Sequence, residues 1–177
     1  TMPLYEQEVF PVFQNRMYDS YEEARNCPKG DIRLVEDALT GIVRNVAFQP
    51  ELMVYDQHYQ NEQGNSPSFQ LHLDVVADIT ERLLGRWKLI EVGCGKGYFL
   101  EKLAARGMEI TGFDPAYDGQ STLIRREEFS SSLIDRAHGL ILRHVLEHVQ
   151  NPVSFLVQIA KANGNSGRIY IEVPCFE

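Results

Sequence analysis

Hydrophobic residues change their spacing along the chain in a way that separates helices from strands. Between residues 66 and 85 they recur at the spacing of one helix face, with Phe69, Leu73, Val76, Ile79 or Thr80, and Leu83 in apolar positions. Ser66-Pro67 offers this helix a capping serine and a first-turn proline, and Gly85 is expected to end it.

Short apolar runs predict strands at 88–92, 109–113, 139–143 and 168–173, with a weaker candidate at 121–126. Helical patterns lie between them at 98–106, ending before Gly107, and from Asn151-Pro152 to Asn163-Gly164. Because strands and helices alternate, the predicted fold class is α/β with a mainly parallel sheet.

The first 65 residues have a different pattern. They are rich in Tyr, Asn, Gln and Pro, and only short apolar pieces interrupt them. A helical turn or two is expected at 20–25. We therefore expect an irregular N-terminal extension with short strands at 1–65, followed by a core at 66–177.

Three alternate glycines, Gly93, Gly95 and Gly97, follow the first core strand, and a helix is expected to open at Tyr98. Glycine lets a ligand approach bare backbone, and the helix N-terminus directs unpaired N–H groups to the same place. The next predicted strand ends at Asp114, where an acidic residue typically binds a ribose diol. The pattern predicts a nucleoside-cofactor site.

The glycine spacing narrows the choice of cofactor. Dinucleotide-binding turns read G-x-G-x-x-G, whereas here the third glycine comes one residue early and Glu91 lies two residues before the first. A carboxylate there would repel a pyrophosphate but suits a cofactor with an ammonium and a sulfonium. The P-loop pattern is absent, because Gly97 leads into Tyr98.

These residues resemble the class I S-adenosylmethionine (SAM)-dependent methyltransferases. Their motif E/D-x-G-x-G-x-G matches residues 91–97, and their second-strand acid matches Asp114. The resemblance implies a Rossmann-like sheet with strand order 3-2-1-4-5-7-6, of which this sequence supplies five strands. We expect a sheet truncated after the fifth strand, or one whose open edge another chain covers, as in a homo-oligomer; a natural five-stranded minimal domain is the remaining alternative.

Residues 54–69 and 142–152 resemble the sugar-modifying C-methyltransferases more narrowly. That resemblance implies a nucleotide-linked keto-sugar as acceptor, which loses a proton beside its ketone before it takes the methyl group. Two features depart from the family. Residues 37–41 stand where the family has zinc-binding cysteines, so no metal is expected, and the family's part beyond the fifth strand is missing.

The resemblance implies a set of cofactor-binding residues: Glu91, Gly93, Cys94, Gly95, Gly97, Tyr98, Phe113, Asp114, Pro115, Arg143 and His144. Glu91 would accept a hydrogen bond from the methionine end, or else serve as a helix-cap partner. Asp114 would bind both ribose hydroxyls, or else be a plain turn aspartate. Cys94 is expected to pack within the turn rather than act as a nucleophile, and Tyr98 either lines the pocket or packs.

His144 and His148 are the catalytic candidates, because in this fold the end of the fourth strand faces the methyl-transfer region. Histidine titrates near pH 7 and can act as a general base. His144 lies nearer the strand end, whereas His148 is equally compatible with a structural role. Two further groups, Tyr55 with His58 and Tyr59, and Glu127 with Glu128 and Phe129, would contact the cofactor or belong to ordinary packing and a solvated loop.

Composition excludes several classes of protein. A net charge of −8 over 177 residues argues against nucleic acid as a partner. Apolar runs are too short for a membrane span, no signal pattern is present, and three scattered cysteines suggest reduced thiols, so a cytoplasmic location is expected. The sequence thus predicts a methyltransferase for a small-molecule acceptor. A non-catalytic SAM-binding module or half of a larger assembly is the alternative, and the glycine spacing disfavours a nicotinamide-linked oxidoreductase.

Overall fold

The computed structural model describes residues 2–13, 16–54, 66–134 and 136–175. The chain divides into two compact units, Thr1–Glu62 and Gln63–Glu177, and each is described by itself.

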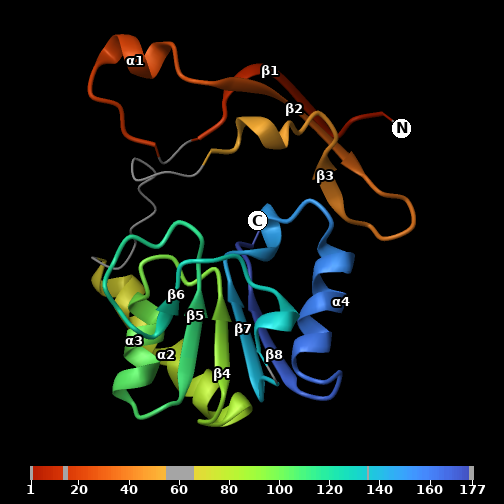
Figure 1. Cartoon of the computed structure of the whole chain (residues 1–177). Helices are drawn as coiled ribbons and strands as arrows, with labels where there is room; N and C mark the ends of the chain where they lie inside the picture. The colour runs from red at the N-terminus through yellow and green to blue at the C-terminus, as the bar shows by residue number, and fades with distance from the viewer. Residues whose placement is uncertain (1, 14–15, 55–65, 135, 176–177) are drawn as a thin grey trace. The chain divides into compact units, whose positions relative to one another are not determined.

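The larger unit is built on five parallel strands: β4 (Leu89–Val92), β5 (Ile110–Phe113), β6 (Ile124–Arg125), β7 (Gly139–Arg143) and β8 (Arg168–Glu172). Their order across the sheet is β6-β5-β4-β7-β8 (Figure 1). In register, Leu89 faces Ile110 on one side and Gly139 on the other. This is the order 3-2-1-4-5 that the sequence resemblance implied, so the α/β Rossmann-like prediction is confirmed.

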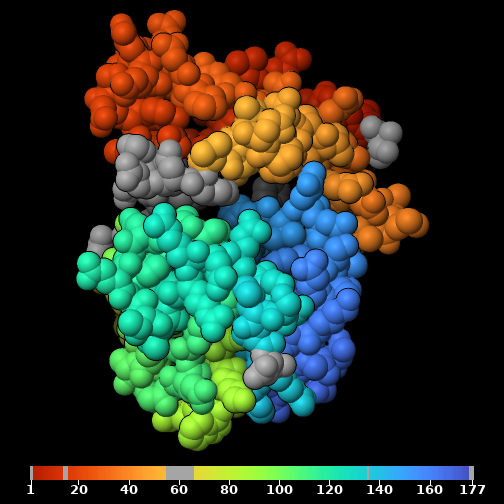
Figure 2. Space-filling view, in the orientation of Figure 1, coloured from red at the N-terminus to blue at the C-terminus, as the bar shows by residue number. Residues whose placement is uncertain are grey.

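Helices cover both faces of this sheet. One core cluster joins α2 (Pro67–Leu84) and α3 (Tyr98–Ala105) to alternate strand residues, among them Leu89 and Ile141. The other cluster joins α4 (Pro152–Ala162) and the segment around η2 (Ser131–Leu133) to the intervening strand residues, such as Ile90. Figure 2 shows part of this second layer, with the segment that follows β5 in green to cyan and α4 in blue. Strand residues therefore alternate between two apolar layers, as a buried parallel sheet requires.

Helix boundaries follow the capping residues that the sequence predicts. The Ser66 hydroxyl accepts the Phe69 N–H at the start of α2, and the Asn151 side chain accepts the Ser154 N–H at 3.1 Å at the start of α4. The buried face of α2 differs from the predicted one near its end. Leu83 is 45% exposed, whereas Thr80 and Leu84 are buried, because the 3.6-residue period carries the apolar stripe one position onward.

The smaller unit contains an antiparallel sheet of β1 (Tyr5–Pro11), β2 (Lys29–Glu36) and β3 (Val43–Asn45). Helix α1 (Tyr21–Arg25) is capped by Ser20, and η1 (Pro50–Leu52) follows β3. The turn from β2 to β3 carries residues 37–41, where the sequence resemblance had pointed to missing zinc ligands. There the Asp37 carboxylate accepts the N–H groups of Leu39 and Thr40, and these bonds lower the pKa of Asp37.

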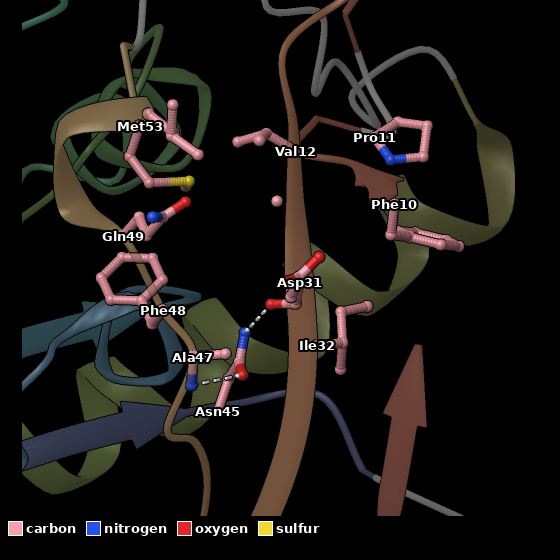
Figure 3. Close-up of a pocket in the computed structure, with 12 residues that line it drawn as sticks. Phe10, Pro11, Val12, Asp31, Ile32, Asn45, Ala47, Phe48, Gln49 and Met53 are labelled. Atoms are coloured by element: carbon pink, nitrogen blue, oxygen red, sulfur yellow. Dashed lines mark hydrogen bonds between the residues drawn. The ribbon is translucent and has the colours of Figure 1, made fainter. Parts of the chain in front are cut away.

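A pocket of about 250 Å³ lies within the smaller unit (Figure 3). Apolar side chains such as Ile32, Phe48 and Met53 line it. Asn45 braces its wall, donating to the Asp31 carbonyl at 3.0 Å and accepting the Ala47 N–H at 3.1 Å. The pocket is therefore an apolar hollow supported by one satisfied amide.

The described residues contain neither a cluster of metal ligands nor a helix that could span a membrane. Within the described ranges, no group of three or more His, Cys, Asp or Glu side chains is arranged to hold a metal ion. Among the helices of the described part, none has the length and apolar character needed to cross a bilayer. The expectations about metal, nucleic acid and location stay predictions.

Candidate functional site

The glycine turn connects the carboxyl end of β4 to α3. It therefore lies at the end of the sheet where all five parallel strands have their carboxyl ends (Figure 1). Gly93, Gly95 and Gly97 have φ angles of +68°, +56° and +84°, in the left-handed region that glycine adopts without strain. The N–H groups of Gly93 and Cys94 donate to the Phe113 carbonyl at 2.8 and 3.3 Å. The turn is thus fixed to the end of β5.

The three glycines are required for different reasons. A Cβ on Gly93 would lie 2.5 Å from Cγ2 of Val145, and a Cβ on Gly97 would collide with Ile124. Packing therefore excludes side chains at these two positions. A Cβ on Gly95 would meet no atom within 4 Å. Gly95 therefore faces open space, where a ligand can lie against the backbone.

Replacing Gly95 with alanine is expected to weaken SAM binding at least fivefold, because the new methyl group enters the open space at the turn. The left-handed backbone should also cost about 1 kcal/mol of stability. Gly107→Ala is the matched control, since Gly107 has φ +80° and no neighbour closer than 3.8 Å. Calorimetry and thermal unfolding should show a similar stability loss in both variants and reduced affinity in Gly95→Ala alone. Equal affinities would remove Gly95 from the site.

Glu91 is a buried acid on β4, with only 2% of its surface exposed. Burial raises its pKa to about 8; the Arg143 guanidinium opposes this effect, and the carboxylates of Asp114 and Glu172 add to it. Among the described residues, its Oε2 atom has no hydrogen-bond partner. A buried carboxyl with a free oxygen beside an open turn suits a cationic ligand group.

Asp114 follows β5 and connects the glycine turn to the turn that follows β5. Its Oδ2 accepts the Gly95 N–H at 2.7 Å, and its Oδ1 accepts the Ala116 N–H at 2.9 Å. A carboxylate has about four lone-pair sites, so both oxygens keep capacity for further donors. Asp114 therefore braces the glycine turn and can still accept hydrogen bonds from a diol.

The other predicted turn residues are placed as follows. Cys94 is half-buried against Gly112, and burial, with Glu91 and Asp114, raises the pKa of its thiol, which stays protonated. Tyr98 and Pro115 have exposed side chains. Phe113 is 1% exposed and packs edge-on against Phe129 at 5.2 Å, so only its backbone faces the turn.

Arg143 and His144 lie at the end of β7 and share one acidic partner. Arg143 Nε donates to Glu172 Oε2 at 2.8 Å, and its guanidinium lies 4.5 Å from the ring centroid of Phe99. His144 has a φ of +53°, and its Nε2 lies 3.3 Å from Glu172 Oε1. The neighbouring Glu172 carboxylate raises the pKa of His144 above its usual value, although partial burial opposes it.

His148 is placed differently from His144. Its side chain is half exposed, and its ion-pair contact is with Glu147, at 4.0 Å. Both residues lie on the 3₁₀ turn η3 (Leu146–His148), and Glu147 also approaches His144 Nδ1 at 3.6 Å. The structure therefore brings His144, and not His148, into the cluster around Glu172.

Sequence reasoning missed two members of this cluster, Glu172 on β8 and His72 on α2. His72 Nε2 lies 2.7 Å from Glu172 Oε1. The available signal was a glutamate in the apolar strand 168–173, at the sheet edge that carries the site. Tyr55, His58 and Tyr59 lie outside the described residues, and Glu127 and Glu128 are exposed.

Five parallel strands in this order, with a glycine turn after the first and an acid after the second, define the Rossmann-like fold of class I SAM-dependent methyltransferases. A family model described as a methyltransferase domain matches residues 36–176, and the chain belongs to this family. Its cofactor is accordingly SAM. The open space at Gly95 and the free oxygen of Glu91 fit such a group.

The chain is also similar to proteins named ubiquinone biosynthesis O-methyltransferase. It is 28% identical to that of Aeromonas salmonicida (strain A449) over an alignment of 116 residues, with coverage of 57% for this chain and 48% for the relative. It is 30% identical to that of Alkalilimnicola ehrlichii over an alignment of 114 residues, with coverage of 56% for this chain and 46% for the relative. The chain spans about half the length of the curated relatives it matches.

Proposed function

We propose that this chain is the SAM-binding and base-carrying part of an enzyme that methylates a small molecule. The observation that carries the proposal is the contact between the glycine turn and the segment after β7. Val145 fills the space that a Cβ on Gly93 would occupy, so His144, its neighbour in sequence, lies beside the cofactor turn. This contact supports a site in which the cofactor and the base would lie side by side.

Each residue of the proposed site would have its own role in binding or catalysis. When bound, SAM supplies a methyl group that is already activated by its sulfonium. The Gly95 backbone and Asp114 would hold the nucleoside, and Glu91 the amino group. His144 would accept the proton that the acceptor loses as it becomes nucleophilic. The rest of the catalysis is alignment and exclusion of water.

Two acceptor classes fit a base in this position. The sequence resemblance favours a nucleotide-linked keto-sugar, which would give up a C–H proton beside its ketone. The O-methyltransferase names of the relatives favour a hydroxyl acceptor, which would give up an O–H proton. Both classes place the same demand on His144. Pairing of a second copy along β8, an edge strand of the sheet, stays a prediction.

Methyl transfer from labelled SAM to a panel of keto-sugar nucleotides and phenols tests the proposal, with calorimetry of SAM and NAD binding beside it. His144→Gln is expected to lower kcat at least a hundredfold for the active acceptor, since a positioned base contributes about 10²- to 10⁴-fold. His138→Gln is the control, because exposed His138 precedes β7 at the opposite end of that strand. SAM binding without transfer to any acceptor would favour the non-catalytic module, and binding of NAD alone would contradict both.

A further inference from the structure

We infer that Glu172 is a positioning residue that holds His144 in place as the base, an inference that rests on the proposed function. Glu172 ends β8 and gathers basic side chains from two other parts of the larger unit. Arg143 and His144 come from the end of β7, and His72 comes from α2. One carboxylate thus contacts three basic side chains at the end of β7.

Glu172 holds His144 at two points. Its backbone carbonyl accepts the His144 N–H at 2.9 Å, and its Oε1 lies 3.3 Å from Nε2 of the imidazole. His144 has a left-handed φ of +53°, which is unfavourable for a residue with a side chain. Such a conformation persists only where the surrounding structure determines it, and these two contacts supply that determination.

The carboxylate of Glu172 is itself fixed and charged. Arg143 donates to it at 2.8 Å, and Tyr170 donates its hydroxyl to Oε2 at 3.3 Å. The Arg143 and Glu172 side chains are 9% and 13% exposed, so this ion pair is largely shielded from water. Burial alone raises the pKa of Glu172, but the contacts with His144, Arg143 and His72 outweigh it and place the pKa well below its usual value.

A charged acceptor beside Nε2 decides which nitrogen of His144 can act as the base. A carboxylate accepts hydrogen bonds and donates none, so it favours the imidazole tautomer with its proton on Nε2. The lone pair then lies on Nδ1. Nε2 is buried and has no aligned hydrogen bond within the described part of the chain, and a small ring rotation toward Glu172 would complete one. Catalytic hydrogen bonds often tighten in this way when substrate binds.

The other charged groups around His144 act more weakly or through Glu172. Glu147, on η3, lies 3.6 Å from Nδ1 and raises the pKa of His144 after Glu172, while Arg143 lowers it. His72 approaches the same Oε1 atom at 2.7 Å and so competes with His144 for it. Because Glu172 contributes more than Glu147, removing its charge should have the larger effect on the ring.

Glu172→Gln tests the inference, because glutamine keeps the shape and the backbone carbonyl but loses the charge. We expect the NMR titration midpoint of the His144 Cε1–H signal, assigned with His144→Gln, to fall by about half a pH unit or more. The acid limb of the kcat profile should move to lower pH by the same amount, with kcat about tenfold lower and the KM for SAM within about twofold. Glu147→Gln is the matched control and should shift the midpoint less.

Three results would overturn the inference. In the wild-type protein, a His144 midpoint at or below 6.5 would contradict it without any variant, so a Glu172→Gln protein that fails to fold leaves the test intact. An unchanged midpoint in folded Glu172→Gln would contradict it as well, and so would an equal shift in Glu147→Gln. Failure of the proposed function shows separately, as wild-type protein that transfers no methyl group while the titrations still report on His144.

Discussion

Glu91→Gln is expected to stabilise the cofactor-free chain at pH 8 and, at the same time, to weaken SAM binding at least tenfold. The first effect follows from burial. The pKa of Glu91 rises from 4.5 to about 8 in the folded chain, so between these values the unfolded chain gives up a proton that the folded chain keeps. Stability therefore falls as pH rises through this window and levels off above it.

The size of this effect follows from the same two values. One pKa unit corresponds to about 1.4 kcal/mol, so the range from 4.5 to about 8 amounts to roughly 5 kcal/mol. Glutamine has no proton to lose and removes this pH dependence. A cationic ligand would draw the proton from Glu91 and pair with the resulting carboxylate, which an amide cannot become, and a hydrogen bond to a charged group is worth about 1.5 to 3 kcal/mol.

Thermal unfolding of cofactor-free protein from pH 5 to pH 8 measures the first effect, and calorimetry with SAM at pH 7 measures the second. Glu109→Gln is the control, because it makes the same chemical change at an exposed position. Glu109 precedes β5, at the opposite end of the sheet from the glycine turn. The stability difference between wild type and Glu91→Gln should grow with pH. A constant difference would contradict the assignment of a proton to Glu91.

Asp114→Ala is expected to weaken SAM binding tenfold or more. The substitution removes the acceptor that we propose for the ribose diol, and it also releases the Gly95 N–H, which now donates to Asp114 Oδ2 at 2.7 Å. The turn would lose its anchor and the nucleoside its acceptor in a single change. Asp114→Asn keeps one acceptor oxygen and should lose less affinity.

Calorimetry with SAM, and with adenosine alone, tests whether Asp114 acts on the nucleoside part of the cofactor. The nucleoside fragment should lose affinity in the same proportion as the whole cofactor, because the diol belongs to both. Asp118→Ala, on the exposed loop that follows, is the matched control and should bind SAM like the wild type. Unchanged affinity in Asp114→Ala would leave Asp114 as a turn residue only.

Much of the larger unit could be predicted from the sequence because its signals are local. Ser66 and Asn151 cap helices through bonds to residues three positions on. The strand 139–143 is marked by a continuous apolar run and has the predicted bounds. The glycine spacing with Glu91 and Asp114 identified the cofactor class, since the chemical role expected of each residue follows from its position next to a predicted strand end.

The rest depends on partners that are distant in the sequence. Glu172 becomes a site residue only because β8 pairs with β7 and sets it beside Arg143. His72 reaches the same carboxylate across 100 positions of sequence. In the smaller unit, every residue of β1 is exposed. β1 therefore lacks the alternation of buried and exposed residues that would predict its pairing with β2. Patterns along the chain predict individual helices and strands well, but they predict the contacts between these elements poorly.

The contact between Gly93 and Val145 has a consequence for how this site can vary among relatives. The side chain of Val145 occupies the volume that residue 93 leaves empty, so the two positions share one volume across 52 residues of sequence. A larger residue at position 145 would overlap sterically with the glycine turn. A smaller one would leave a cavity next to His144 and weaken the packing that fixes its position. We therefore expect sequence drift at these two positions to be correlated, with the size of residue 145 setting the spacing between cofactor and base.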